Sequence, residues 1–518
     1  MLKIKRALIS VYDKTDIVPF AKKLRAQGVE IISTGGTLAT LQKNKIKATS
    51  ISKVTCFPEI LEGRVKTLHP VIHGGLLYLR GNKKQRKEAA AHGINPIDLV
   101  VVNLYPFTKV IQKKNISLAT ALENIDIGGP TMLRAAAKNF SSVAVVCDIN
   151  DYDLILSLMK RHNGGIPQTI LKKLAEKVFS LTASYDAAIQ IYLASDNKEM
   201  PTCLSSVYKK ALPLRYGENP HQKGAFYKKR GDALPFKQLH GKEISYNNIM
   251  DFYAAREIIN EFVNPAAAVI KHTNPCGIAE SCTLEEAINK AIYSDPLSAF
   301  GGIVIVNCPV GRAGAARVLE KLAFFEMLIA PSFTPEALGL LKTRKNLRII
   351  ETGDSAQRMA REQFMLRYVG NGMLMQEHDI AINEYLPQLK KQMKVVSKRK
   401  PSSKDMTELI FAWKCAKVVK SNAVVLTKDA GTIGIGAGQM SRIDAMEIAC
   451  RKAGTRSSDA YVASDGFFPK ADNITVAAKA GVKAIIQPGG SIRDGEVIDA
   501  VNKHNLMMVL TGKRHFRH

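Results

Sequence analysis

Residues 266–281 are AAAVIKHTNPCGIAES, a strand-forming run that ends in two adjacent cationizable side chains, Lys271 and His272. Pro275 favours an extended residue before it and Gly277 permits a sharp turn, so we expect both side chains at the tip of a rigid strand. Histidine is the usual general base near neutral pH, and a strand tip leaves it open to a reactant. A single histidine in a strand is more often structural than catalytic. The adjacent Lys271, the turn and the RYGENPH stretch upstream make the two interpretations equally favoured here.

A second stretch repeats this pattern. Residues 423–438 are AVVLTKDAGTIGIGAG, where an apolar run again reaches a lysine, a turn and a second strand, which predicts an internal duplication. Its alternating Gly and Ile indicate a strand against which another backbone packs. They do not form a dinucleotide-binding loop, because the third glycine of G-x-G-x-x-G would fall on Gln439. An NAD-dependent oxidoreductase is therefore disfavoured.

The remaining apolar segments predict an α/β protein, and a length of 518 residues suggests about three domains. In the first 195 residues, short strands alternate with segments of helical length, which predicts a parallel sheet. These strands are expected at residues 7–12, 29–34, 98–105 and 142–147. After a break at residues 195–201 we expect a longer mixed α/β region, divided in two by a basic Pro/Ser linker at residues 394–404. Its strands are expected at residues 266–270, 301–306, 423–427, 432–438 and 483–488.

The composition favours a cytoplasmic protein with reduced thiols. No run of roughly 18 apolar residues could span a bilayer, and Asp13 breaks the first apolar stretch too early for a signal peptide. The eight cysteines lack the C-x-x-C spacing of zinc or redox sites, and Ala279 leaves the P-C-x-x-C pattern of zinc deaminases incomplete. We therefore expect no zinc.

The formal net charge of +28 would suit a nucleic-acid binder, which is the competing hypothesis. Basic residues are spread along the chain without forming an arm, and the densest stretch is the linker at residues 394–404. Small anionic substrates explain the charge as well, and so does a generally basic proteome.

Two N-terminal stretches are candidate anion sites. Residues 33–37, STGGT, lie between a strand and a helix, which predicts a cradle of backbone amides or, equally, a tight turn that needs glycine. In LEGRVKTLHP, residues 61–70, an extended backbone would place Arg64 and Lys66 on one face beside Thr67. Two converging cations suit a phosphate or an oxyanion, although a solvated basic loop is as consistent.

A third stretch, DIGGPTMLRAAAKNF at residues 126–140, contains a helix start at its glycines and Pro130. Arg134 and Lys138 then lie four residues apart on one helical face, where an anion or solvent must offset their repulsion. Asp126 precedes the turn, and it could pair with Lys138 and assist proton transfer.

Taken together and in this order, these stretches closely resemble the bifunctional AICAR formyltransferase/IMP cyclohydrolase family of purine biosynthesis over nearly the whole chain. The motifs are SVYDK, STGGT, GRVKTLHP, NLYPF, DIGGPTMLRAAAKN, RYGENPHQ, KHTNPCG, SAFGG, SNAVV, GIGAGQMSR, SDGFFP and RHFRH. The resemblance implies the last two steps of IMP synthesis: formyl transfer from 10-formyltetrahydrofolate to AICAR, then dehydrative ring closure of formyl-AICAR to IMP.

For residues 1–197 the resemblance implies a cyclohydrolase domain with a methylglyoxal-synthase-like fold. Ring closure needs proton transfer and a stabilised oxyanion rather than a metal. By motif, Lys138 is the implied proton donor or acceptor, Lys66 its helper, and Tyr105 and Asp126 are further catalytic residues. The implied substrate-binding residues are Tyr12, Asp13, Lys14, Thr34, Gly35, Gly36, Thr37, Arg64, Val65, Thr67, Asn103, Leu104 and Ile127.

For residues 198–518 the resemblance implies a formyltransferase domain of two cytidine-deaminase-like halves. His272 would take a proton from the attacking amine, and Lys271 would stabilise the developing charge. Residues implied on the AICAR side are Arg215, Tyr216, Gly301, Glu326, Asn422, Arg442, Phe467 and Arg514, and those near the folate are Ile443, Asp472, Ser491 and Ile492. The family can use Asp at position 326, and Arg514 would make the terminal RHFRH part of the site rather than a frayed tail.

The resemblance also implies small-molecule substrates, with 10-formyltetrahydrofolate as cosubstrate and no tightly bound cofactor. A monovalent cation is left open. Family members are homodimers whose formyltransferase sites draw on both chains, and no nucleic-acid or membrane partner is implied.

Overall fold

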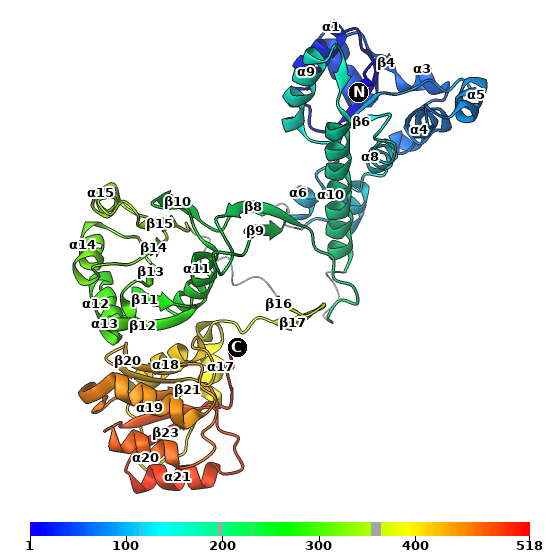
Figure 1. Ribbon diagram of the computed structural model, residues 1–518. Coiled ribbons are helices and arrows are strands. Elements are labelled where there is room, and N and C mark those ends of the chain that lie inside the picture. The colour runs from blue at the N-terminus through cyan, green and yellow to red at the C-terminus, as the bar shows by residue number, and fades with distance from the viewer. Residues whose placement is uncertain (114, 195–198, 230–231, 354–363) are drawn as a thin grey trace. The chain divides into compact units, whose positions relative to one another are not determined.

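The structure is a computed structural model that describes residues 1–518 except 114, 195–198, 230–231 and 354–363. It forms two compact units, which are described separately (Figure 1). Unit 1 comprises Met1–Lys209 and Lys228–Asp232, and unit 2 comprises Lys210–Tyr227 and Ala233–His518. The domain boundary expected at residues 197 and 198 lies outside the described residues. No described helix is long and apolar enough to cross a bilayer.

Unit 1 contains the predicted parallel sheet, with strand order β4-β3-β2-β5-β6. Its central strands are nearly continuous apolar runs, as expected where helices cover both faces of a sheet. α8 packs on β5 and β6, and α10 packs on α8 and β6. The strands are β2 (Arg6–Val11), β3 (Glu30–Ser33), β4 (Thr49–Ser50), β5 (Leu99–Asn103) and β6 (Ala144–Val146); β1 (Leu2–Lys3) pairs separately with β7 (Gly165–Ile166).

The helices of unit 1 begin and end at ordinary signals, such as the Ser117 cap of α7 and the glycines that open α8. The described helices are α1 (Ile17–Ala26), α2 (Gly35–Lys43), α3 (Ile51–Thr55), α4 (Pro70–Leu77), α5 (Lys83–Ala91), α6 (Phe107–Ile111), α7 (Leu118–Glu123), α8 (Gly128–Lys138), α9 (Tyr152–Arg161) and α10 (Gln168–Leu193), with 3-10 turns η1 (Leu61–Gly63) and η2 (Ile149–Asp151).

Unit 2 is built on one mixed sheet with strand order β10-β15-β14-β13-β11-β12-β20-β19-β21-β22-β23-β18. The order is the same from each edge to the central β12 and β20 pair, so the predicted internal duplication is confirmed. The first half contains β10 (Lys237–His240), β11 (Ala266–Lys271), β12 (Asn274–Glu280), β13 (Ile303–Val306), β14 (Met327–Ala330) and β15 (Arg348–Glu351). The second contains β18 (Lys394–Val395), β19 (Val424–Lys428), β20 (Gly431–Gly436), β21 (Tyr461–Ser464), β22 (Ala484–Gln487) and β23 (Met507–Leu510).

The helices of unit 2 repeat in the same order around the sheet. Those of the first half are α11 (Tyr246–Ile259), α12 (Leu284–Ser294), α13 (Pro296–Ala299), α14 (Arg312–Lys321) and α15 (Pro335–Leu341). α17 (Ile382–Gln392) comes next, followed in the second half by α18 (Ser403–Lys417), α19 (Arg442–Ala453), the 3-10 turn η4 (Gly454–Ser457), α20 (Asp472–Lys479) and α21 (Asp494–Lys503). Two further antiparallel pairs are β8 (Tyr208–Leu214) with β9 (Gly224–Lys229), and β16 (Phe364–Val369) with β17 (Gly372–Glu377).

The glycines of the two duplicated stretches permit close packing of helices. A side chain on Gly434 or Gly436 would collide with backbone carbonyls of α19, which confirms the prediction of a strand packed against another backbone. Gly277 has the same role in β12, beneath α12. The sharp turn expected there is therefore wrong, and the chain reverses earlier, at His272 and Thr273.

The expected linker at residues 394–404 is instead the ordered start of the second half. β18 pairs with β23, and buried Ser397 accepts a hydrogen bond from the backbone N–H of Met508 at 2.8 Å. Ser402 then caps α18 in a capping box with Asp405. The position of the division was predicted, but its basic Pro/Ser composition belongs to an edge strand and a helix cap.

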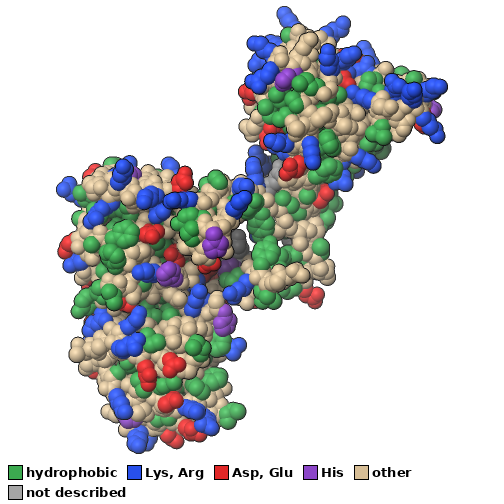
Figure 2. Space-filling view, viewed as in Figure 1, with side chains coloured by type: hydrophobic (Ala, Val, Ile, Leu, Met, Phe, Trp, Pro, Cys, Tyr) green, Lys and Arg blue, Asp and Glu red, His purple; other side chains and the backbone are tan. Residues whose placement is uncertain are grey.

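Lysine and arginine side chains are spread over the faces seen in Figure 2, with a concentration on α5. That helix begins KKQRK, and of its residues only Ala89 is buried. Its basic residues are about as dense as those of residues 394–404, the stretch that the sequence analysis singled out.

Candidate active sites

In unit 1, predicted site residues gather where the parallel strands β2, β3 and β5 end. Asn103, at the end of β5, fixes the loop after β2, because its Oδ1 accepts from the backbone N–H groups of Tyr12 at 2.7 Å and Asp13 at 2.9 Å. Its Nδ2 donates to Asp13 O at 2.9 Å. The carboxyl ends of parallel strands share one edge of the sheet, which explains how residues 90 positions apart meet.

Two lysines lie over the N-terminus of α2, where free backbone amides and the helix dipole favour an anion. Ideal Cβ positions on Gly36 and Gly35 would lie 3.8 Å from Lys14 Nζ and Lys66 Nζ, respectively. The hydroxyl of Thr37 is occupied inside the fold, with Val11 N–H and C=O both 3.0 Å away. Backbone amides and two ammonium groups thus lie together here, an arrangement suited to an anion.

Near these lysines, half-buried Asp126 accepts hydrogen bonds from the backbones of Gly129 and Tyr105, and the Tyr105 side chain is exposed. Burial raises the pKa of Asp126, opposed by hydrogen bonds from Gly129 and Tyr105 and by the charge of Lys66. Burial likewise raises the pKa of Tyr105, and the charge of Asp126 adds to it. A carboxyl group with a raised pKa beside an ammonium is suited to move protons near neutral pH.

Two predicted residues do not join this group within one chain. Lys138 ends α8 whereas Asp126 precedes that helix, so a rise of about 1.5 Å per residue separates them by roughly 15 Å. The expected pairing of the two is therefore wrong. Arg64 follows a 3-10 turn rather than an extended strand, and its guanidinium pairs with Glu123 on the surface instead of sharing a face with Lys66.

The other predicted residues of unit 1 surround the cluster. The Tyr12 and Tyr105 rings are 5.4 Å apart, Thr67 is buried beside Gly128, and Thr34 bonds Ser10 through its hydroxyl at 2.7 Å. Val65 bridges to Ile60, Leu104 packs on the core, and Ile127 is exposed before α8.

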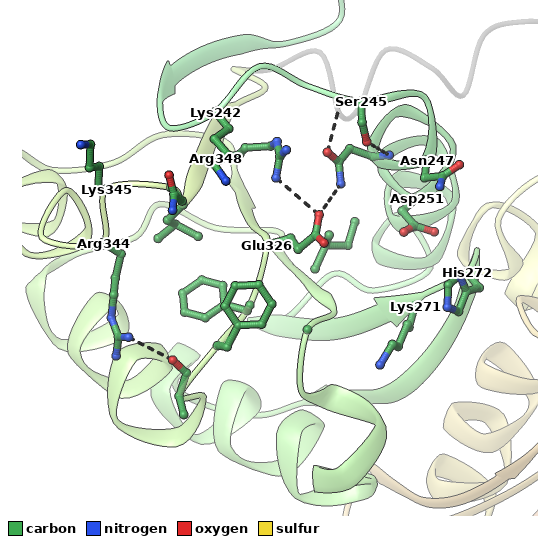
Figure 3. A pocket seen from close by; sticks show the side chains of 18 of the residues that line it. Lys242, Ser245, Asn247, Asp251, Lys271, His272, Glu326, Arg344, Lys345 and Arg348 are labelled. Carbon is green, nitrogen blue, oxygen red and sulfur yellow. Dashed lines mark hydrogen bonds and ion pairs between the residues drawn. The ribbon is translucent and has the colours of Figure 1, made fainter. Parts of the chain in front are cut away.

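In unit 2, predicted residues line a cavity of about 560 Å³ (Figure 3). Those in the wall are Tyr216, Lys271, His272, Gly301 and Glu326. Sequence reasoning missed all its other polar residues, which are Lys242, Ser245, Asn247, Asn248, Asp251, Arg344, Lys345, Asn346 and Arg348. No motif signalled them, because they come from a helix and two loops that only the fold brings together.

Lys271 and His272 lie at the tip of the β11–β12 hairpin, as predicted. His272 and Thr273 have φ of 52° and 63°, the left-handed pair of a two-residue type I′ turn. The Lys271 Nζ donates to Phe300 O at 3.0 Å, and Asp251 accepts from the Thr273 N–H at 2.6 Å. His272 is exposed at the turn, which leaves its ring open to the cavity.

Glu326 lies in the middle of the cavity between two groups that the sequence did not indicate. Its Oε2 accepts from Asn248 Nδ2 at 3.0 Å and lies 3.4 Å from an Arg348 guanidinium nitrogen. Burial lowers the pKa of Arg348, opposed by the charge of Glu326. The carboxylate is thus fixed by two donors, with its remaining lone pairs facing the cavity.

A second group of predicted residues lies in the other half, around buried Asp465. Arg442 pairs with Asp465, donates to Ser464 Oγ at 2.9 Å and to Asn422 Oδ1 at 2.8 Å. Lys420, two residues before Asn422, donates its backbone N–H to Asn274 Oδ1 at 3.1 Å. Because Asn274 directly follows the His272–Thr273 turn, this bond joins the second half to the start of β12 beside the hairpin tip.

The C-terminal residues are held against this second group rather than frayed. His515 is buried, and its Nδ1 lies 2.6 Å from Asp379 Oδ2. Exposed Arg514 lies over the ring of Phe516 at 4.5 Å. The other predicted residues here are exposed or half-buried and do not line the cavity: Arg215, Ile443, Phe467, Asp472, Ser491 and Ile492.

These features define an α/β protein with a candidate site in each unit: backbone amides and two lysines beside Asp126 and Tyr105 in unit 1, and a cavity lined by Lys271 and His272 in unit 2. The family model for the AICARFT/IMPCHase bienzyme matches residues 136–452, and that for the MGS-like domain matches residues 16–131.

The chain is also similar to curated proteins over its whole length. The "Bifunctional purine biosynthesis protein PurH" of Anoxybacillus flavithermus is 49% identical over 520 residues, covering 99% of this chain and 100% of that protein. The protein of the same name from Oceanobacillus iheyensis is 48% identical over 523 residues, with the same coverage. A crystal structure of ForH aligns with 36% of this chain and 97% of the ForH chain, at 35% identity and with a TM-score of 0.34.

The chain belongs to the AICARFT/IMPCHase bienzyme family, with an MGS-like N-terminal domain. It is accordingly an AICAR formyltransferase and an IMP cyclohydrolase of purine biosynthesis. The resemblance stated from the sequence motifs is thus confirmed.

Proposed function

We propose that unit 2 transfers the formyl group of 10-formyltetrahydrofolate to AICAR and that unit 1 closes formyl-AICAR to IMP, with the domain boundary at residues 197 and 198. The observation that carries this division is the pairing of His272 and Lys271 at a rigid hairpin tip in the cavity of unit 2. Formyl transfer needs a base for an amine and a cation for an oxyanion, and these two side chains supply both.

In this mechanism His272 takes a proton from the 5-amino group of AICAR as the nitrogen attacks the formyl carbon. The new C–N bond forms, the bond from that carbon to N10 of the folate breaks, and N10 takes up a proton as tetrahydrofolate leaves. Lys271 stabilises the oxyanion, because its bond to Phe300 O fixes the ammonium at the cavity wall.

His272→Ala tests this assignment. We expect formyl transfer to be abolished while cyclisation of supplied formyl-AICAR continues at the wild-type rate. His504→Ala, at an exposed site after α21, is the matched control and keeps both activities. Loss of both activities in a folded His272→Ala protein would contradict the separation of the two sites.

The remaining predicted residues of unit 2 bind the substrates in this proposal. Arg215, Tyr216, Gly301, Glu326, Asn422, Arg442, Phe467 and Arg514 contact AICAR, and Ile443, Asp472, Ser491 and Ile492 lie near the folate. The bond from Lys420 to Asn274 supports a site that uses both halves of the sheet. We further propose a homodimer whose formyltransferase sites draw on both chains, measurable as a dimer mass by light scattering.

For ring closure, the phosphate of formyl-AICAR binds at Gly35 and Gly36 beneath Lys14. The carboxamide nitrogen then attacks the formyl carbon. Asp126 takes one of the two protons of that nitrogen, and Lys66 protonates the formyl oxygen, which becomes a hydroxyl group. Lys66, now neutral, takes the proton of the formamide nitrogen as the C=N bond forms, and protonated Asp126 returns its proton to the hydroxyl group, which leaves as water, so that both side chains regain their starting states. The position of Lys66, near Gly35 and able to influence Asp126, supports a role between phosphate and ring.

Lys138 cannot join this step in its own chain, so we propose that it acts in the site of a second copy. Lys138→Ala and Lys66→Ala should each lose cyclisation and keep formyl transfer. Mixed dimers of the two variants should regain part of the cyclisation, because one of their sites combines the intact residues of both chains. Mixed dimers as inactive as the parents would contradict this assignment.

We place both reactions in the cytoplasm and assign the basic charge to anionic substrates rather than to nucleic acid. The eight cysteines, all within the described residues, form no disulfide, in keeping with a reducing compartment. No three His, Cys, Asp or Glu side chains of the described residues lie together as metal ligands would, so no step of the mechanism runs through a metal.

The assignment of the basic charge to anionic substrates is tested by nucleic-acid binding. Steeply salt-dependent, submicromolar binding to DNA or RNA would contradict that assignment. We also propose that a monovalent cation binds to the formyltransferase. If so, the rate of formyl transfer should be higher in potassium chloride than in choline chloride.

A further inference from the structure

Among the described residues that line the cavity, Asp251 is the carboxylate that contacts the hairpin carrying His272. Figure 3 labels both residues. It lies on α11, six residues after the cap Ser245, and accepts the Thr273 N–H at 2.6 Å. His272 and Thr273 both have a left-handed backbone conformation, which costs a residue other than glycine about 1–2 kcal/mol. A charge-assisted hydrogen bond to this turn therefore fixes where the imidazole points.

The second half of unit 2 repeats this construction without a histidine. Glu408 lies six residues after the cap Ser402 of α18, and its carboxylate accepts the Ala430 N–H at 3.1 Å. The hairpin turn is Asp429 and Ala430, with φ of 52° and 53°. A carboxylate that holds the hairpin turn is thus a feature of both halves of the fold. Asp251 differs from Glu408 because the turn that it holds carries His272.

The charges around His272 come from four elements. Asp251 faces it from α11, Glu326 from the residue before β14, and Lys271 from the hairpin itself. Lys420, which follows α18, bonds the start of β12 through its backbone. Burial raises the pKa of Asp251, and the Thr273 N–H and the charge of His272 oppose that rise. The carboxylate and the imidazole therefore interact electrostatically.

We propose that Asp251 is a positioning residue for formyl transfer, which fixes the turn that carries His272 and favours the imidazolium formed when the amine loses its proton. This rests on the proposed role of His272. As the imidazole accepts the proton, a positive charge appears beside a fixed carboxylate, and the transition state gains more from that neighbour than the ground state does.

Two substitutions separate the parts of this role. Asp251→Asn keeps an acceptor for the Thr273 N–H but removes the charge, so we expect kcat to fall by about tenfold, with a smaller change in KM for AICAR. The acidic limb of the kcat profile should move to lower pH, because the neutral amide no longer favours the protonated imidazole. Asp251→Ala also frees the turn, and we expect kcat to fall by about 10²-fold.

Glu408→Gln and Glu408→Ala are the matched controls, since they change the same contact in the hairpin without a histidine. They should lower the melting temperature as the Asp251 variants do, yet leave kcat and its pH profile unchanged. Cyclisation of supplied formyl-AICAR should be unchanged in all four proteins.

Asp251 variants whose kcat and acidic limb matched those of the Glu408 variants would overturn the proposal and leave Asp251 a structural residue. That result is distinguishable from failure of the proposed function, in which His272→Ala itself would retain formyl transfer.

Discussion

Replacing Gly277 with alanine tests how closely the catalytic hairpin depends on the packing of α12. A Cβ on Gly277 would lie 2.0 Å from the backbone oxygen of Ala291, whereas real Cβ atoms essentially never approach within 3.0 Å. Neither atom belongs to a flexible side chain, so β12 or α12 must move by about 1 Å. Overpacking of this kind costs about 2 kcal/mol, which lowers the melting temperature of a unit of this size by roughly 3 °C.

The displaced strand carries the His272 turn, so formyl transfer should fall by about 10²-fold, since a shift of 1 Å at a reacting group has effects of that size. Cyclisation should be unchanged, because its residues lie in unit 1. Gly339→Ala is the control: it lies inside α15 with no atom within 4 Å of the added methyl group, and it should stabilise the protein slightly. Differential scanning calorimetry and separate assays of the two reactions give the answer. Gly277→Ala with wild-type stability and formyl transfer would refute this reasoning.

Three further predictions concern proton transfer, a buried ion pair and acid stability. Asp126→Asn should abolish cyclisation, and in the wild type the acidic limb of the cyclisation rate should lie above the ordinary aspartate range, because burial raises the pKa of Asp126. Lys417→Met leaves Glu261 buried without its partner at 2.5 Å, so urea denaturation should show a loss of about 3–5 kcal/mol, largely recovered when Glu261→Gln is added. Burial opposes ionisation of Asp379, yet its bond with His515 and nearby lysines lower its pKa below the usual 3.8. The stability it contributes is therefore complete above about pH 4 and lost as the pH falls through the lowered pKa, a loss that Asp379→Asn should lack in melting curves.

Some misjudged residues show where sequence patterns stop being informative. Gly277 stands in a Pro-Cys-Gly sequence typical of turns, yet the hairpin turns at His272 and Thr273, because register with β11 and the approach of α12 decide the matter. Lys138 and Asp126 belong to one motif, but the rise of the helix between them keeps them apart.

The sequence by itself determined the parallel sheet of unit 1, some of the strands of unit 2, the duplication there and the Lys271–His272 tip, whereas strands such as β12, β14 and β21 were not predicted. Each depends on residue types spaced two to four positions apart, a range that local periodicity records. Only the tertiary structure decided which groups face these residues. Asn248, Asp251 and Arg348 reach the cavity from a helix and from the start of a strand up to about a hundred residues further along the chain. Such contacts are set by the packing of sheet and helices, and no short stretch of sequence records them.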